Sequence, residues 1–210
     1  MKTHFIPVIS KETLDYSKIK ELIQKEMSEK KIAICYSNQF VGIAKELEKK
    51  IGKEVLFKTQ VLGCSSPKFP KDVEAILIIG QGKFHSVSLA YESKLPTYIL
   101  ENGSVVKIKQ EEVEKLRKRE QGMYLKYLNS EKVGILVSTK PGQQQLKKSI
   151  EFKKNMKDKS SYLFIANDLD ISEFENFGID CWVNSACPRM DLTEGSIINM
   201  NKIPQNNSIS

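Results

Sequence analysis

The sequence of 210 residues lacks several features that would assign it to a class. No apolar run approaches the roughly 20 residues of a membrane-spanning helix. The first seven residues hold no apolar run long enough for a signal peptide. Only four cysteines are present and none forms a Cys-x-x-Cys pair, which argues against a disulfide framework and a zinc ribbon. These absences predict a cytoplasmic protein that does not contact a membrane.

A strong excess of one charge is also lacking, although the balance is basic. Lys and Arg number 33 against 26 Asp and Glu, which gives a net charge of +7. Much of the lysine alternates with glutamate, as in 46–50 and 111–120, and this pattern is typical of solvated helix faces. The alternative is an acidic or RNA-containing partner, such as the ribosome. Because an RNA-binding aromatic motif is missing, we expect no direct contact with nucleic acid.

Short apolar runs alternate along the chain with amphipathic stretches. This alternation predicts an α/β fold with mostly parallel sheets. The predicted strands are 31–36, 54–57, 75–79, 97–100, 133–137, 162–165 and 181–183. The predicted helices are 40–50, 111–128 and 143–156, with a further lead-in helix before residue 30.

A weak internal repeat divides the chain. Residues 31–37 align with residues 132–138 at an offset of about 101 residues, near a usual domain size. We therefore expect two repeated three-layer α/β units. The first, 1–130, includes the lead-in helix and Cys64, and the second, 131–210, includes Cys187 and a polar tail.

Two cysteines stand in unusual settings. Cys64 lies in a Gly-Cys turn after an apolar approach, and Cys187 lies just past an apolar strand, followed by Pro188. Because the carboxyl ends of parallel strands form the ligand-binding edge of a sheet, both are candidate ligands in a shared crevice. The alternative is that each is a small buried hydrophobic residue. Cys35 and Cys181 lie within predicted strands, where a core position is expected.

Two loops add polar candidates at strand ends. The segment from Gly80 to His85 has a Gly-x-Gly pattern that lets a ligand approach the backbone, but it is a poor dinucleotide motif. His85 is either a ligand contact or a satisfied interior histidine. The segment from Ser138 to Gln143 opens onto a predicted helix and can hold a carboxylate or a phosphate, or it is an ordinary helix cap.

Four segments, taken in order, resemble a known family. They are Gln60-Val61-Leu62-Gly63-Cys64, the stretch from Ile79 to His85, Val137-Ser138-Thr139-Lys140-x-Gly142-Gln143, and Val183-Asn184-Ser185-Ala186-Cys187-Pro188-Arg189. Their order and spacing are similar to those of the archaeal diphthamide synthases, the 2-(3-amino-3-carboxypropyl)histidine synthases. The resemblance extends over nearly the whole chain.

The resemblance implies a specific chemistry. Members of the family have three repeated α/β domains, each giving one cysteine to a [4Fe–4S] cluster that binds S-adenosylmethionine. Reductive cleavage yields a 3-amino-3-carboxypropyl radical, which attacks a histidine of the translocating elongation factor. By this similarity Cys64 and Cys187 are the cluster ligands of the second and third domains. The residues implied to line the S-adenosylmethionine pocket are Gln39, Gly80, Gly82, His85, Ser138, Thr139, Lys140, Gly142, Gln143 and Arg189.

The chain also departs from the family. It begins where the second domain would, and position 40 is phenylalanine where the family usually has histidine after glutamine. We therefore expect a split enzyme, active in a homo- or hetero-oligomer whose partner polypeptide supplies the first domain and the third cysteine. The alternative is a non-catalytic scaffold or electron-relay partner of a complete synthase.

Overall fold

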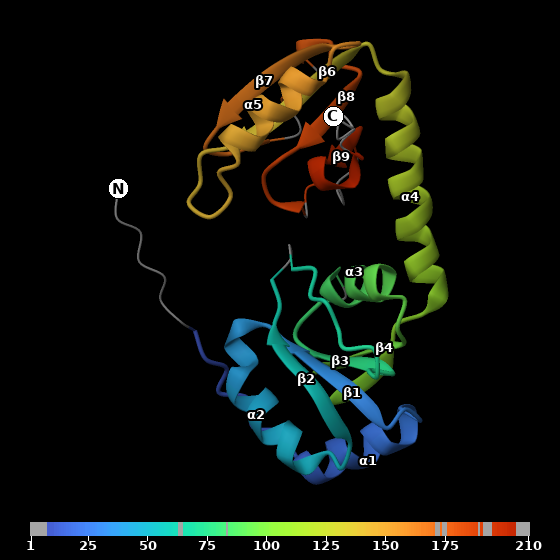
Figure 1. Cartoon of the computed structure of the whole chain (residues 1–210). Helices are drawn as coiled ribbons and strands as arrows, with labels where there is room; N and C mark the ends of the chain where they lie inside the picture. The colour runs from blue at the N-terminus through green and yellow to red at the C-terminus, as the bar shows by residue number, and fades with distance from the viewer. Residues whose placement is uncertain are drawn as a thin grey trace. The chain divides into compact units, whose positions relative to one another are not determined.

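The structure is a computed structural model of the chain, and it describes residues 8–62, 65–82, 84–170, 173, 176–188, 190 and 195–204. It divides into two compact units, Met1–Arg117 and Lys118–Ser210 (Figure 1). The division falls within helix α4, Gln110–Asn129, whose last residue immediately precedes the boundary expected from the repeat. Each unit is built around one sheet.

The first unit contains a five-stranded sheet in the order β2-β1-β3-β4-β5. The first four strands are parallel, and β5 pairs antiparallel with β4 through a hairpin at Asn102 and Gly103. Both hairpin residues have positive φ, at 50° and 72°, the conformation that the Asn-Gly pair favours. The strands are Lys31–Tyr36 (β1), Glu54–Gln60 (β2), Ala75–Ile79 (β3), Thr97–Glu101 (β4) and Ser104–Lys107 (β5).

Helices cover both faces of this sheet. Helices α1, Tyr16–Glu26, and α2, Val41–Lys50, pack their apolar stripes into one core, while α3, Phe84–Ser93, packs on the other face (Figure 1). All five residues of β3 are therefore buried, as expected for a strand in the middle of a parallel sheet.

The second unit contains a four-stranded, fully parallel sheet in the order β7-β6-β8-β9. On one face, Tyr127 of α4 and Phe152 of α5 pack against β6 and β8. On the other face, Trp182 packs with residues from the irregular segments that follow β7. The elements are Lys132–Ser138 (β6), Leu146–Asn155 (α5), Ser160–Ala166 (β7), Cys181–Asn184 (β8), Ile197–Asn199 (β9) and a 3-10 turn, Met200–Lys202 (η4).

The predicted fold class is confirmed: the chain is α/β with two mostly parallel sheets. The repeat extends to the strand order, because β2-β1-β3-β4 of the first sheet corresponds to β7-β6-β8-β9 of the second. Strands β5 and β9 and helix α3 were not predicted. The described residues contain no helix long and apolar enough to cross a membrane.

Identical hydrogen bonds recur in both units. The Glu74 carboxylate accepts hydrogen bonds from the N–H groups of Lys30 (2.7 Å) and Lys31 (3.1 Å), where β1 begins. In the second unit the Asp180 carboxylate accepts from the N–H groups of Glu131 (3.0 Å) and Lys132 (2.8 Å), where β6 begins. A lysine next to each site, Lys53 in one unit and Lys159 in the other, donates to two backbone carbonyls at or just after the end of a helix.

Candidate functional site

Cys187 lies in a loop that follows the carboxyl end of β8. Ser185 starts the loop, and its backbone N–H and hydroxyl both donate to the Leu136 carbonyl of β6, at 3.0 and 2.7 Å. The buried Asn184 side chain then accepts from the Ala186 N–H at 2.9 Å and donates to the Cys187 carbonyl at 2.8 Å. The loop that carries the thiol is therefore hydrogen-bonded to the sheet at consecutive residues.

The described cysteines differ in accessibility. Cys187 is a free, half-exposed thiol, whereas Cys35 and Cys181 are fully buried within β1 and β8. Burial raises the pKa of Cys35 to about 12 and that of Cys181 to about 11. A thiolate is the form that binds a metal. The expectation that Cys35 and Cys181 are core residues is confirmed, and Cys187 is the described cysteine whose thiol a ligand can reach.

Cys64 and Arg189 lie outside the described residues. On either side of Cys64, the Val61 N–H donates to the Tyr36 carbonyl of β1 at 2.9 Å, and the Ser65 N–H donates to the Leu62 carbonyl at 3.0 Å. Their roles, Cys64 as a cluster ligand and Arg189 in the S-adenosylmethionine pocket, remain predictions.

The first unit brings several predicted residues to the carboxyl edge of its sheet. The Ser37 N–H donates to the Ile79 carbonyl at 3.1 Å, which places the short 3-10 turn containing Gln39 next to Gly80. The Gly82 N–H donates to the Glu101 carboxylate of β4 at 2.6 Å, and Gly82 has a φ of 81° that disfavours a side chain. His85 follows, half-buried, in the first turn of α3.

The second unit builds a compact turn from Ser138 to Gln143 at the carboxyl end of β6. The buried Ser138 hydroxyl accepts from the Lys140 N–H at 3.1 Å, and the Gln143 N–H donates to the Lys140 carbonyl at 3.0 Å. Gly142 has a φ of 81°, which closes the turn. Thr139 donates its backbone N–H to the Ala166 carbonyl of β7 at 3.0 Å.

Lys140 makes an ion pair with Asp168, just after β7. The hydrogen bond from Lys140, together with one from Asn167, holds the pKa of the Asp168 carboxyl below its usual range. Both side chains of the pair are largely exposed. The ammonium group therefore lies at the sheet edge, in water, where it can exchange Asp168 for another carboxylate.

Within the second unit, the Ser138 turn and the Cys187 loop follow the neighbouring strands β6 and β8 at one edge of the sheet. Within the first unit, the Gln39 turn and the glycine loop likewise share one edge. Sequence reasoning assigned no role to Glu101, Asp168 or Asn199. Only the proximity of Asp168 and Glu101 to strand ends could have indicated them, whereas no sequence signal indicated Asn199.

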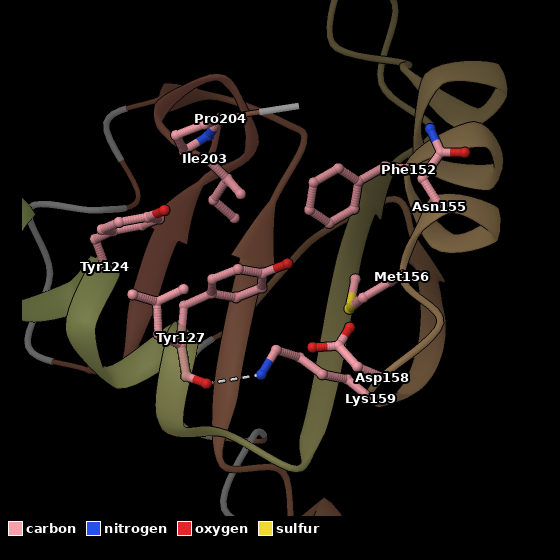
Figure 2. Close-up of a pocket in the computed structure, with 10 residues that line it drawn as sticks. Tyr124, Tyr127, Phe152, Asn155, Met156, Asp158, Lys159, Ile203 and Pro204 are labelled. Atoms are coloured by element: carbon pink, nitrogen blue, oxygen red, sulfur yellow. Dashed lines mark hydrogen bonds between the residues drawn. The ribbon is translucent and has the colours of Figure 1, made fainter. Parts of the chain in front are cut away.

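A pocket of the second unit lies at the opposite, amino end of the sheet. Its volume is about 220 Å³, and Tyr124, Tyr127, Phe152 and Lys159 are among its lining residues (Figure 2). Burial, with Asp158 nearby, raises the pKa of Tyr127 to about 12. Lys159 donates to the carbonyls of Leu128 and Ser130, each at 2.8 Å, so its ammonium group is already satisfied. The pocket contains none of the predicted site residues.

Taken together, the fold and the loops define a class: an α/β protein made of repeated units that carries an accessible cysteine and polar turns at the carboxyl edges of its sheets. Residues 1–197 match the model of the diphthamide synthesis protein family. The chain belongs to this family.

Similar proteins agree with this assignment. The 2-(3-amino-3-carboxypropyl)histidine synthase of Methanocaldococcus jannaschii is 30% identical over 205 residues, which is 92% of this chain and 57% of that protein. The Pyrococcus horikoshii synthase is 28% identical over 64% of this chain and 40% of its own length. The chain thus spans about half the length of the curated relatives it matches.

The fold is similar to that of a solved structure. Dph2 from Pyrococcus horikoshii, determined with a 4Fe-4S cluster, superposes with a TM-score of 0.73 at 24% identity, over 89% of this chain and 60% of that one. This similarity independently supports the α/β architecture.

Proposed function

We propose that the chain is part of a 2-(3-amino-3-carboxypropyl)histidine synthase. It would transfer the 3-amino-3-carboxypropyl group of S-adenosylmethionine to a histidine of the translocating elongation factor. The observation that carries the proposal is the family match over residues 1–197, which includes both cysteine motifs.

The described residues fit an iron–sulfur cluster through Cys187. Its thiol is free and half-exposed, and the loop around it is anchored on β6 and β8. Iron–sulfur clusters are held by cysteine thiolates. We propose Cys64 as the second ligand of the same cluster, by its place in the family motif. When bound, the cluster would supply the electron that cleaves a carbon–sulfur bond of S-adenosylmethionine.

The turn from Ser138 to Gln143 would bind and orient S-adenosylmethionine. Lys140 is exposed and paired with a carboxylate in the structure, and this is the chemistry needed to receive the substrate's own carboxylate. The glycine loop at Gly80 and Gly82, with Gln39 and His85 beside it, would accommodate the remainder of the molecule. Loss of the transferred group from S-adenosylmethionine leaves 5′-methylthioadenosine, a product that can be measured.

A further protein or domain would complete the enzyme. The family resemblance implies three thiolates, and this chain has two in matching motifs. The Yarrowia lipolytica relative, 26% identical over 67% of this chain, is named as subunit 1 of its synthase, which supports a multi-subunit assembly. We propose that the partner supplies the first domain and the third cysteine.

The test combines the anaerobic chain with elongation factor, S-adenosylmethionine and dithionite as the reductant. A chain carrying the first domain of the Methanocaldococcus jannaschii relative is added as the source of the third thiolate. The proposal expects a mass increase on the elongation factor and an equal amount of 5′-methylthioadenosine, both dependent on this chain. If the added chain forms the same amount of product when this chain is left out, the non-catalytic scaffold is favoured.

A further inference from the structure

Two neighbouring strands of the second sheet end in asparagines that face each other. Asn184 closes β8 and Asn199 closes β9, and the two are partners in the strand register. Their exposed fractions are only 2% and 4%. Burying an amide is costly unless its polar atoms are hydrogen-bonded. The pair therefore requires an explanation beyond packing.

The hydrogen bonds of the pair converge on the cysteine loop. The Asn184 amide nitrogen donates to the Cys187 carbonyl at 2.8 Å and to the Asn199 side-chain oxygen at 2.7 Å. The Asn199 amide nitrogen donates to the Pro188 carbonyl at 3.0 Å. Backbone groups are unambiguous donors or acceptors, so these partners fix which way each amide is turned.

The first unit shows that the fold does not need asparagines at these positions. In the second sheet, Asn184 pairs with Leu136 of β6 and with Asn199 of β9. In the first sheet, Ile78 takes the place of Asn184, because it pairs with Cys35, the equivalent of Leu136. Ile99, which pairs with Ile78, takes the place of Asn199. Both isoleucines are 2% exposed. The same pair of register positions is thus apolar in the first unit, where the loop after β3 carries no cysteine, and polar in the second unit, where the loop after β8 carries Cys187.

We propose that Asn184 and Asn199 are positioning residues that set the conformation of the Cys187 loop for binding iron, an inference that rests on the proposed function. The amides occupy the carbonyls of Cys187 and Pro188 and the N–H of Ala186. The loop backbone is then held at three consecutive residues, which restricts the region that the Cys187 thiol can occupy. In metal sites, groups that orient a ligand typically contribute 10- to 100-fold to metal affinity.

The test uses the full chain and three changes. Asn199→Ala removes the side-chain amide that donates to the Pro188 carbonyl. Asn184→Asp keeps the acceptor for Ala186 but loses both amide donors. The double variant Asn184→Ile/Asn199→Ile installs the residues that the first unit has at the equivalent register positions. Asn155→Ala, at the exposed end of α5, is the matched control.

Two readouts separate this inference from the proposed function. The first is the alkylation rate of Cys187 in a cluster-free Cys64→Ala background, where the remaining cysteines are buried. The second is the rate of iron loss to a chelator from the reconstituted chain. We expect the three variants to alkylate at altered rates and to lose iron about 10- to 100-fold faster than the control.

Wild-type alkylation and wild-type iron retention in all three folded variants would overturn the positioning role. If the wild-type chain binds no iron on its own, the third thiolate must come from the proposed partner, and the alkylation rates alone decide whether the asparagines set the position of the Cys187 thiol.

Discussion

Gly134 of β6 pairs with Trp182 of β8, and the absence of a side chain at Gly134 leaves the space that the indole ring occupies. A Cβ atom placed on Gly134 would lie 2.4 Å from the indole ring, closer than real Cβ contacts. The ring also packs edge-to-face on Phe164, with ring centroids 4.7 Å apart, so any shift of the indole would disturb this contact.

Gly134→Ala should therefore destabilise the second unit. Overpacking of a filled core typically costs about 1–3 kcal/mol, so we expect a loss of this order in the free energy of unfolding, measured in urea. Gly122→Ala is the control, because nothing lies within 4 Å of its added methyl group on α4. Equal stability of the Gly134→Ala and wild-type chains would show that the indole ring can move.

Lys140 offers a second test at the residue scale. Its ion pair with Asp168 is exposed, and exposed pairs contribute little to stability. Lys140→Met should leave the melting temperature unchanged but weaken S-adenosylmethionine binding about tenfold, the loss expected for a hydrogen bond between charged groups. Calorimetry of the reconstituted chain measures both, with Lys148→Met on α5 as the control. Unchanged affinity would remove Lys140 from the proposed substrate site.

The asparagine pair marks the limit of sequence reasoning for single residues. Cys187 could be singled out from its position after an apolar strand and before a proline. Asn199 could not, because its role depends on a strand pairing between segments that are distant in the sequence. The polar atoms that hold a ligand loop are often contributed by a neighbouring strand, and a sequence motif does not contain them.

At the scale of elements, both first strands begin in the same way. Glu74 and Asp180 each accept two backbone N–H bonds at the start of the first strand of their unit, β1 or β6. The N–H bonds of Lys132 and Glu131 hold the pKa of the Asp180 carboxyl below its usual range, and those of Lys31 and Lys30 do the same to the pKa of Glu74.

This arrangement predicts a pH-dependent stability. A carboxyl whose pKa is lower in the folded state stabilises fully above its unfolded value of about 4, and the effect is lost as pH falls through the folded value. Asp180→Asn should therefore lower the melting temperature at pH 7, and the difference from wild type should shrink below about pH 4. Glu151→Gln, on the exposed face of α5, is the control. If the difference in melting temperature between Asp180→Asn and wild type does not change with pH, the charge of the Asp180 carboxylate does not contribute to stability.

Strong apolar runs allowed most strands to be predicted, whereas weaker elements were missed. Strand β3 was predicted with the bounds that the structure shows, because five consecutive apolar residues end at a glycine. Strand β9 is only three residues long, and such a run is below the length at which a period can be recognised. Helix α3 was missed because a helix buried beside a glycine loop lacks a clear polar stripe.

At the scale of the whole molecule, two units with the same strand order carry different residues at equivalent positions. The alternation of apolar runs with amphipathic stretches allowed the α/β class to be predicted, and the internal repeat allowed the two-unit organisation to be predicted. The proposed chemistry depends on the differences, namely the cysteine loops and the turn at Ser138. The family match over residues 1–197 is what connects these loops to one function.

The central claim is that Cys64 and Cys187 are thiolate ligands of an iron–sulfur cluster. Its most direct test is the iron and acid-labile sulfide content of the anaerobically reconstituted chain, with a small monothiol present to occupy open coordination sites. We predict iron with a broad thiolate-to-iron absorption band in the wild-type chain and in Cys181→Ala, and its loss in Cys64→Ala and Cys187→Ala. A full wild-type cluster in the Cys187→Ala chain would contradict the account.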